Sequence, residues 1–184
     1  MQSLNSTTKL IYLSLLLAVA LILSILESSF PPLFPVPGAK LGLANVTTIL
    51  ILLNFKNRDC LYFLVARILL VSFLSMGFFS AAFFISLFGT TLSFIFTYLV
   101  LKKDLFSLPF VGVIGACTHN IGQLLAAMFI LNTTALIYYL PLLLLFAIPT
   151  GLCTGLIAKH LQPTFKNHKN ILLHKKEDEV FPSL

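Results

Sequence analysis

Six long apolar runs follow one another along the chain. Breaking the sequence at charges, prolines and polar clusters places these runs near residues 10–26, 43–55, 60–77, 81–101, 108–131 and 137–158. A helix needs about 20 apolar residues to cross roughly 30 Å of hydrocarbon, and 58% of the 184 residues are hydrophobic while 10% are charged. We therefore predict an all-α integral membrane protein, a bundle of six transmembrane helices. The second run has only 13 residues, so we expect it to begin earlier, to be tilted or to be partly re-entrant.

The segments between these runs carry charge on alternate sides. Lys9, the stretch 56–59 (KNRD), the stretch 102–104 (KKD) and the lysines of the tail fall on one side, whereas the opposite connections hold only Lys40. The positive-inside rule then predicts a multi-pass protein of the cell membrane with both termini in the cytoplasm. The net charge of +6 is explained by this orientation, and no nucleic-acid partner is expected. We divide the chain into a membrane domain, residues 1–160, and a flexible cytoplasmic tail, residues 161–184.

The longest outward connection, residues 27–45, contains four of the nine prolines. Proline restricts its own backbone and that of the residue before it, so this segment is expected to be an ordered cover across the mouth of the bundle. Gly38 and Gly42 give the backbone freedom to turn or to approach a ligand closely. Lys40 and Glu27 either anchor helix ends at the membrane interface or meet a ligand, and their spacing does not decide between the two.

Three strongly polar residues lie inside the fifth run, in the stretch GACTHNIGQLL. His119 and Gln123 are four residues apart and share a helix face, while Asn120 is turned by about a quarter of a turn or slightly more. At this depth the side chains should point into the bundle, either to bond neighbouring helices or to line a pocket. Because Gly112, Gly115 and Gly122 lie on the same helix, we expect open space there and assign His119, Asn120 and Gln123 to ligand binding.

Arg67 is the costly charge inside the third run. Asp59 and Asp104 are both expected near the inner surface, and no acidic residue is expected at the depth of Arg67. We interpret Arg67 as a structural anchor to a helix terminus, and a direct ligand contact is the alternative.

Aromatic residues are abundant, with eighteen phenylalanines and no tryptophan. Most of them are expected to face lipid. Phe79 and Phe83, predicted at the outward mouth, are candidates to line a site for a flat or apolar molecule.

Motifs for hydrolysis, phosphoryl transfer or metal-assisted chemistry do not occur in the sequence. It has no Walker A glycine loop, no GxSxG, no HExxH and no DDxxD run. Cys60, Cys117 and Cys153 are widely spaced and form no CxxC pair, so they are interpreted as packing residues. Neither catalytic residues, nor an intrinsic metal, nor an intrinsic cofactor is predicted, and a protein that binds or transports a ligand is favoured over an enzyme.

Four stretches, in order, carry a resemblance to a known family: AVALILSILES (18–28), PGAKLGLANVTTIL (37–50), the arginine of VARILL (65–70) and GACTHNIGQLL (115–125). Together they resemble the Gx transporter family, also called heptaprenyl diphosphate synthase component I, over most of residues 10–160. That family is similar to the substrate-binding S components of energy-coupling factor (ECF) importers. The resemblance implies a six-helix subunit that works with a transmembrane coupling protein and two cytoplasmic ATPases.

S components dock on the coupling protein through small residues of the first helix. The corresponding positions here are Ser14, Ala18 and Ile22, of which Ile22 departs from the small-residue pattern. Other small pairs, Gly151 with Gly155 among them, are typical of close helix packing.

The resemblance places the ligand near the outward surface, under the loop that holds Gly38 to Asn45. A hydrophobic or partly acidic small molecule is expected, and haem or a related tetrapyrrole is the leading candidate. His119 would then be a possible axial ligand of the haem iron and Lys40 a partner of a propionate. Isoprenoid or quinone precursors and flavins are competing ligands.

Two other functions are compatible with the sequence. One is a membrane subunit of a flavin- or quinone-linked extracellular electron-transfer system. The other is an accessory role in polyprenyl diphosphate synthesis. Genes for ATPases and a coupling protein next to this gene would favour import, whereas genes for flavin transferases and quinone reductases would favour electron transfer.

Overall fold

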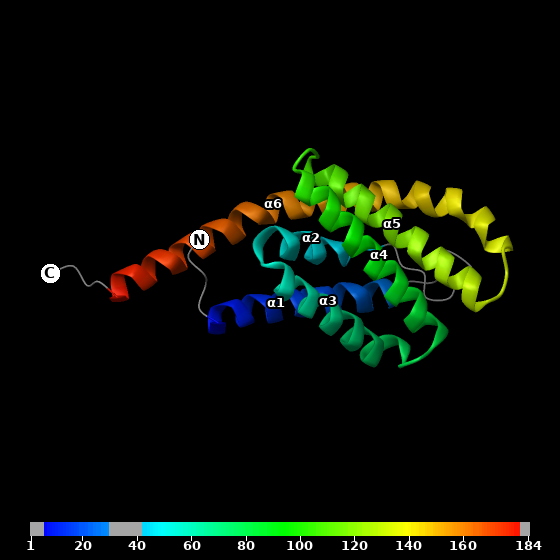
Figure 1. Ribbon diagram of the computed structural model, residues 1–184, viewed down its shortest axis with the longest axis horizontal. Helices are drawn as coiled ribbons and strands as arrows, with labels where there is room; N and C mark the ends of the chain where they lie inside the picture. The colour runs from blue at the N-terminus through cyan, green and yellow to red at the C-terminus, as the bar shows by residue number, and fades with distance from the viewer. Residues whose placement is uncertain (1–5, 30–41, 181–184) are drawn as a thin grey trace.

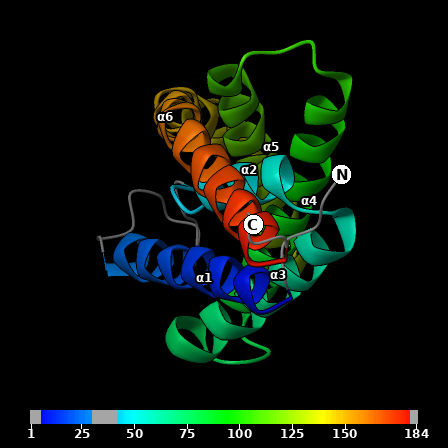
Figure 2. The same ribbon diagram turned by 90° about the vertical axis from the view of Figure 1, so that its left-hand side faces the viewer.

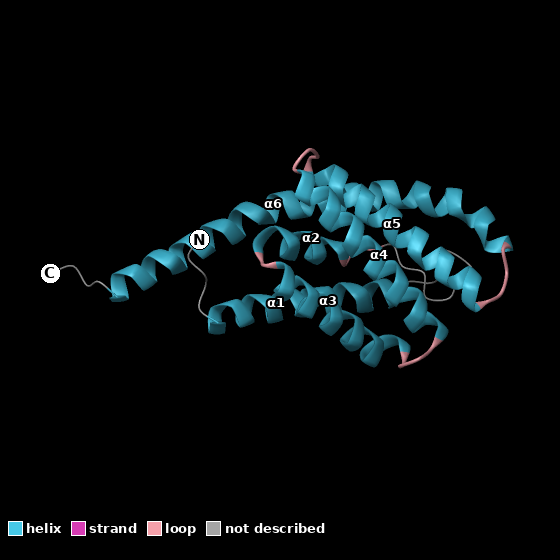
Figure 3. Cartoon of the chain, in the orientation of Figure 1, coloured by secondary structure: helices cyan, strands magenta, loops and turns pink. Residues whose placement is uncertain are grey.

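The computed structural model describes residues 6–29 and 42–180, and within these ranges it consists of helices joined by loops (Figures 1 and 3). Side chains from residue 168 onward lie outside the described part. The described residues form six α-helices, of which those from α2 onward are joined by short connections, and a π-helical and a 3₁₀ segment extend two of them. The elements are α1 (Ser6–Ser29), α2 (Asn45–Asn54), α3 (Asn57–Val71), η1 (Ser72–Met76), α4 (Ala81–Lys103), α5 (Leu108–Ile130), η2 (Ala135–Tyr139) and α6 (Leu140–Val180).

Four helices are long and apolar enough to cross a membrane, and the predicted count of six spans is not confirmed. They are Thr7–Glu27, Ala81–Lys103, Leu108–Ile130 and Ala135–Asn167. With 10 residues, α2 extends about 15 Å, half of the hydrocarbon thickness. The chain is therefore a multi-pass, all-helical membrane protein with one short apolar helix inside it.

The short helix α2 lies at the centre of the bundle. It contacts all five other α-helices, and in the end-on view it lies between α1 and α5 (Figure 2). Residues Asn45 to Ile51 are all buried, and Ile49, Leu50 and Ile51 belong to the main apolar core. Its apolar residues face protein instead of lipid, which is why a helix too short to span fits here.

The ends of α4 and α5 follow ordinary capping chemistry. The side chain of Ser80 accepts a hydrogen bond from Phe83 N at 3.1 Å, which satisfies one free N–H at the start of α4. That helix ends with Lys102 and Lys103, followed by Asp104 in the left-handed conformation (φ 50°). A proline in the first turn of α5 needs no N–H partner. The predicted bounds 81–101 and 108–131 agree with these helices to within two residues.

Helices α4, α5 and α6 pack through glycines. Gly112 of α5 faces Gly151 and Gly155 of α6, and a Cβ added at Gly112 would lie 2.7 Å from Gly155 N. Gly122 of α5 faces α4, where an added Cβ would lie 2.9 Å from the Cα of Gly89. The expectation of open space around the glycines of α5 is therefore wrong, because the backbones of α4 and α6 fill it.

The start of α1, the α2–α3 connection and the end of α6 lie toward one end of the molecule (Figure 1). An ion pair joins two of these elements, with Lys9 Nζ 2.8 Å from Asp59 Oδ1. Lys56 and Arg58 border the same surface hollow as this pair. Lys9 and the positive residues of the α2–α3 connection thus share one end, as the charge pattern predicts. Which side of the membrane that end occupies stays a prediction.

Candidate ligand-binding site

A small internal cavity lies between α1, α3, α4, α5 and the turn that precedes α2. Its volume is about 10 Å³, room for about one water molecule. Its lining is unusually polar for the interior of an apolar bundle. The lining residues are Ser24 and Glu27 of α1, Gly42 of the turn, Arg67, Ile68 and Val71 of α3, Ser86 and Thr90 of α4, and His119 of α5.

Arg67 supplies the positive charge of this cavity. Its side chain is 5% exposed, and Nη1 donates a hydrogen bond of 2.8 Å to Thr48 Oγ1. Among the described residues this is the one hydrogen bond of the guanidinium, which carries five N–H donors. The other N–H donors of this buried guanidinium therefore lie on the wall of the cavity.

Glu27 lines the same cavity as Arg67 and attracts it electrostatically. The expectation that no acidic residue lies at the depth of Arg67 is therefore wrong. The carboxylate of Glu27 also accepts a hydrogen bond from Leu43 N, with Oε1 2.6 Å away. Glu27 thus joins the end of α1 both to α3, through charge, and to the turn before α2.

Gly42 forms this turn in a left-handed conformation, with φ of 86°, which glycine adopts without strain. Its carbonyl accepts a hydrogen bond from Asn45 N at 2.9 Å. Gly42 thus makes a turn, one of the two uses expected of its backbone freedom, and its assignment to ligand binding stays a prediction. Gly38 and Lys40, predicted on the same connection, lie outside the described residues.

His119 and Gln123 lie on one face of α5, as their four-residue spacing predicts. This face packs against α4. Their side chains are 3% and 1% exposed. A Cβ added at Gly89 would lie 2.5 Å from Gln123 Cγ and 3.3 Å from His119 Cε1. Gly89 thus makes room for both side chains, of which the imidazole borders the cavity.

Asn120 points to the other side of α5. It is 1% exposed, and Nδ2 donates a hydrogen bond of 3.0 Å to the carbonyl of Leu143 in α6. This hydrogen bond joins two helices, which is one of the two roles that the sequence left open for Asn120. The assignment of Asn120 to ligand binding stays a prediction.

Asn45, the first residue of α2, lies beside the cavity. It is 3% exposed, and its Nδ2 lies 2.8 Å from the position that a Cβ would occupy on Gly42. The same position lies 3.5 Å from His119 Cδ2. The backbone of Gly42 therefore meets the Asn45 amide and the His119 ring at one wall of the cavity.

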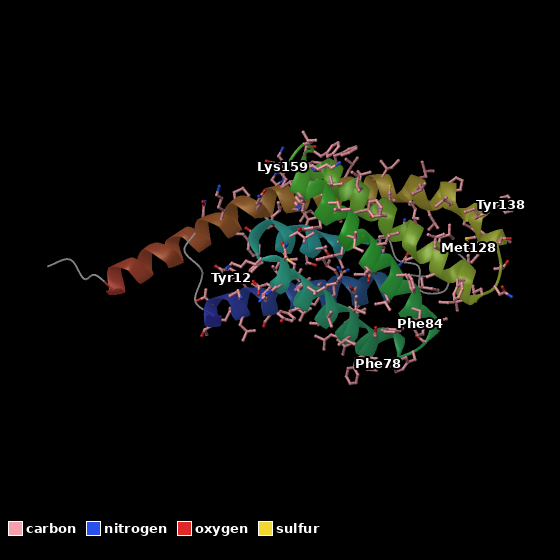
Figure 4. All side chains as sticks on the ribbon, in the orientation of Figure 1. Tyr12, Phe78, Phe84, Met128, Tyr138 and Lys159 are labelled. Atoms are coloured by element: carbon pink, nitrogen blue, oxygen red, sulfur yellow. The ribbon has the colours of Figure 1, made fainter. Side chains whose placement is uncertain are left out.

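Phe79 and Phe83 do not line this cavity. Phe79 is 80% exposed and makes an edge contact with Phe83, with ring centroids 6.1 Å apart. Phe78 and Phe84 lie in the same region, at the end where α3 meets α4 (Figure 4). The structure thus separates the aromatic cluster from the polar cavity.

Hydroxyl residues of the site were missed in the sequence. Thr48 is hydrogen-bonded to Arg67, while Ser24 and Thr90 are buried and line the cavity with Ser86. Each lies in a mostly apolar run, where a serine or threonine most often bonds its own helix backbone. Only their convergence on Arg67 and His119 marks them as part of a site.

The predicted docking positions on α1 are all on the outside of the bundle. Ser14 and Ala18 are exposed, and Ile22 is 57% exposed. This face of α1 is therefore open to lipid or to another membrane protein.

A comparison with protein-family models agrees with the sequence motifs. The model described as heptaprenyl diphosphate synthase component I matches residues 16–161. No curated protein and no solved structure is significantly similar to the chain. The match covers the cavity and every described residue that lines it, so the chain belongs to the heptaprenyl diphosphate synthase component I family, also known as the Gx transporter family.

Proposed function

We propose that this protein is the substrate-binding membrane subunit of an ECF-type importer. The observation that carries the proposal is the buried guanidinium of Arg67 on the wall of an internal polar cavity. Ionisable residues inside a membrane bundle are costly, and they commonly mark the path or the site of a substrate. The cavity draws its residues from four helices and a turn, as a site between the helices of a bundle does.

The geometry favours a mainly apolar ligand with one small acidic group. A planar guanidinium with free donors suits a carboxylate, which it binds through two parallel hydrogen bonds. The cavity has a volume of about 10 Å³, whereas sites that enclose a drug-sized ligand measure roughly 300–1,000 Å³. The acidic group is therefore the part of the ligand that we place at the cavity, which has to widen to admit a carboxylate because it now has room for about one water molecule.

Haem is the candidate to test first, and these contacts shift its expected mode of binding. Ring atom Cδ2 of His119 lies near Gly42, and ring atom Cε1 lies near Gly89. The adjoining cavity is much smaller than a porphyrin. A propionate fits this arrangement better than the macrocycle does. We therefore propose a contact between a propionate and Arg67 in preference to ligation of the iron by His119.

A haem titration of the purified protein tests this mode. We expect wild-type protein to shift the Soret band of haem, and His119→Ala to give the same band position. When Arg67→Met is combined with Glu27→Gln, the affinity for haem should be at least about tenfold lower. A band that moves in His119→Ala would restore iron ligation. An unshifted band in wild type would exclude haem as the ligand.

The importer assignment is tested separately by its partners. We propose that the exposed face of α1 with Ser14 and Ala18 docks on a transmembrane coupling protein that carries two cytoplasmic ATPases. Ala18→Trp should abolish copurification of these three proteins from native membranes, because a bulky ring prevents close helix approach. Mass spectrometry of the copurified proteins measures the loss.

The control for Ala18→Trp is Leu99→Trp, at a position 47% exposed on α4. It should leave copurification unchanged, and both variants should keep the melting temperature of wild type. If neither ATPases nor a coupling protein copurifies with wild type, the importer assignment is refuted.

A further inference from the structure

Asn45 carries unused hydrogen-bonding capacity in the interior of the protein. Its side chain is 3% exposed, and in the described part of the chain neither Nδ2 nor Oδ1 has a hydrogen-bond partner. An asparagine side chain offers two donors and an acceptor oxygen with two lone pairs. Buried groups of this kind are normally paired, and an unpaired one calls for a reason.

Capping does not explain this asparagine. Asparagine is common at helix starts because its side chain bonds a free N–H of the first turn. In α2 the capping position is Ala44, and no side chain caps the helix. Thr47 and Thr48 bond elsewhere, to the carbonyl of Ala44 and to Arg67. The amide of Asn45 therefore contributes no described bond to the start of α2.

The position of Asn45 connects this amide to the cavity. Gly42 lines the cavity, and a Cβ on Gly42 would lie 2.8 Å from Asn45 Nδ2 and 3.5 Å from His119 Cδ2. A side chain at residue 42 would collide with the amide. Glycine therefore lets the amide of Asn45 pack against the backbone at residue 42, on the wall shared with His119.

We propose that Asn45 recognises a group in the substrate that both donates and accepts hydrogen bonds, such as a carboxamide, lactam or ureide. Such a group pairs with the amide of asparagine through two hydrogen bonds, one in each direction. This inference rests on the proposed import function and adds a second polar feature to the substrate, beside the acidic group assigned to Arg67. A carboxylate only accepts hydrogen bonds, so a molecule with no other polar group could pair with Nδ2 of Asn45 but would leave Oδ1 unpaired.

Stability gives a test that needs no knowledge of the substrate. When an unpaired polar group is replaced by an apolar one of similar size, stability stays the same or rises. We therefore expect Asn45→Leu to melt at the same temperature as ligand-free wild type or higher. Asn120→Leu is the matched control, because it removes the hydrogen bond to Leu143 and should melt at a lower temperature.

The second readout is the small-molecule fraction that heat releases from protein purified out of native membranes. Mass spectrometry of this fraction should find a compound with a carboxamide, lactam or ureide group in wild type. Its amount should fall at least about tenfold in Asn45→Leu, as expected for the loss of two hydrogen bonds in a buried site. Asn45→Ala, which cannot overfill the site, should show the same loss.

Four results would overturn the inference. Asn45→Leu and Asn45→Ala could both melt as low as Asn120→Leu, which would make Asn45 a structural residue. The released compound could lack a group that both donates and accepts hydrogen bonds. Alternatively, Asn45→Leu and Asn45→Ala could both retain it at the wild-type level. Either result would leave the importer assignment standing. If wild type releases no compound beyond those recovered in a mock purification from membranes that lack the protein, the proposed function fails, and the role of Asn45 fails with it.

Discussion

Replacing Gly112 by valine is expected to separate α5 from α6 and to cause a large loss of stability. A Cβ at this position would overlap the carbonyl of Gly151 and lie 2.7 Å from Gly155 N. These are backbone atoms, so no side chain can turn away to make room. Overpacking a core usually costs about 1–3 kcal/mol and occasionally more. We expect a cost of at least about 3 kcal/mol, or a melting temperature about 6–12 °C lower, measured by thermal unfolding in detergent.

Two further variants make this result specific. Gly151→Val attacks the same contact from α6, where an added Cβ would lie 2.5 Å from the Cα of Val113, and it should destabilise to a similar degree. Cys153→Leu adds bulk to an exposed position of α6 and should change the melting temperature little. Equal melting temperatures for Gly112→Val and Cys153→Leu would contradict close packing of the two backbones.

Substitution of Arg67 is expected to affect stability and ligand capture in separable ways. Arg67→Met removes the buried guanidinium that attracts the half-buried carboxylate of Glu27, and removing one member of a buried pair costs up to about 3–5 kcal/mol. Combining Arg67→Met with Glu27→Gln removes both charges, which is often nearly neutral. The melting temperature should therefore fall in the single variant and recover in the double variant.

Ligand capture should not recover with stability. The guanidinium contact to an acidic group is absent in both variants, and the loss of a buried charged contact of about 2 kcal/mol corresponds to roughly thirtyfold weaker binding. The amount of small molecule that copurifies with each protein measures this. If the double variant is stable and still retains the wild-type amount of small molecule, Arg67 is only a structural anchor, which is how the sequence was interpreted.

The helix pattern was predictable to different degrees in different parts of the chain. The fourth and fifth runs match α4 and α5 closely because each is bounded by charges, a capping residue or a proline. The second run was read as a span, although α2 is surrounded by other helices. An apolar run has the same composition whether lipid or protein surrounds it, so periodicity alone could not identify the central helix.

The candidate site shows the same division between local and long-range information. The common face of His119 and Gln123 follows from helix geometry and was predictable. The association of Glu27 with Arg67 depends on how α1 and α3 are placed against each other, which no local pattern encodes. The hydrogen bond from Asn120 to α6 was one of two stated possibilities, because a polar side chain of known depth still has several neighbours.

The glycine contacts divide the bundle into a stiff half and a compliant half. Where backbone meets backbone, as between α4, α5 and α6, there are no side-chain rotamers to readjust, so these three helices should move as one block. Contacts of α1 and α3 with the rest depend on longer side chains and on one electrostatic coupling at the cavity. Any widening of the cavity to admit a molecule should therefore come from displacement of α1 and α3, with the block as the fixed frame.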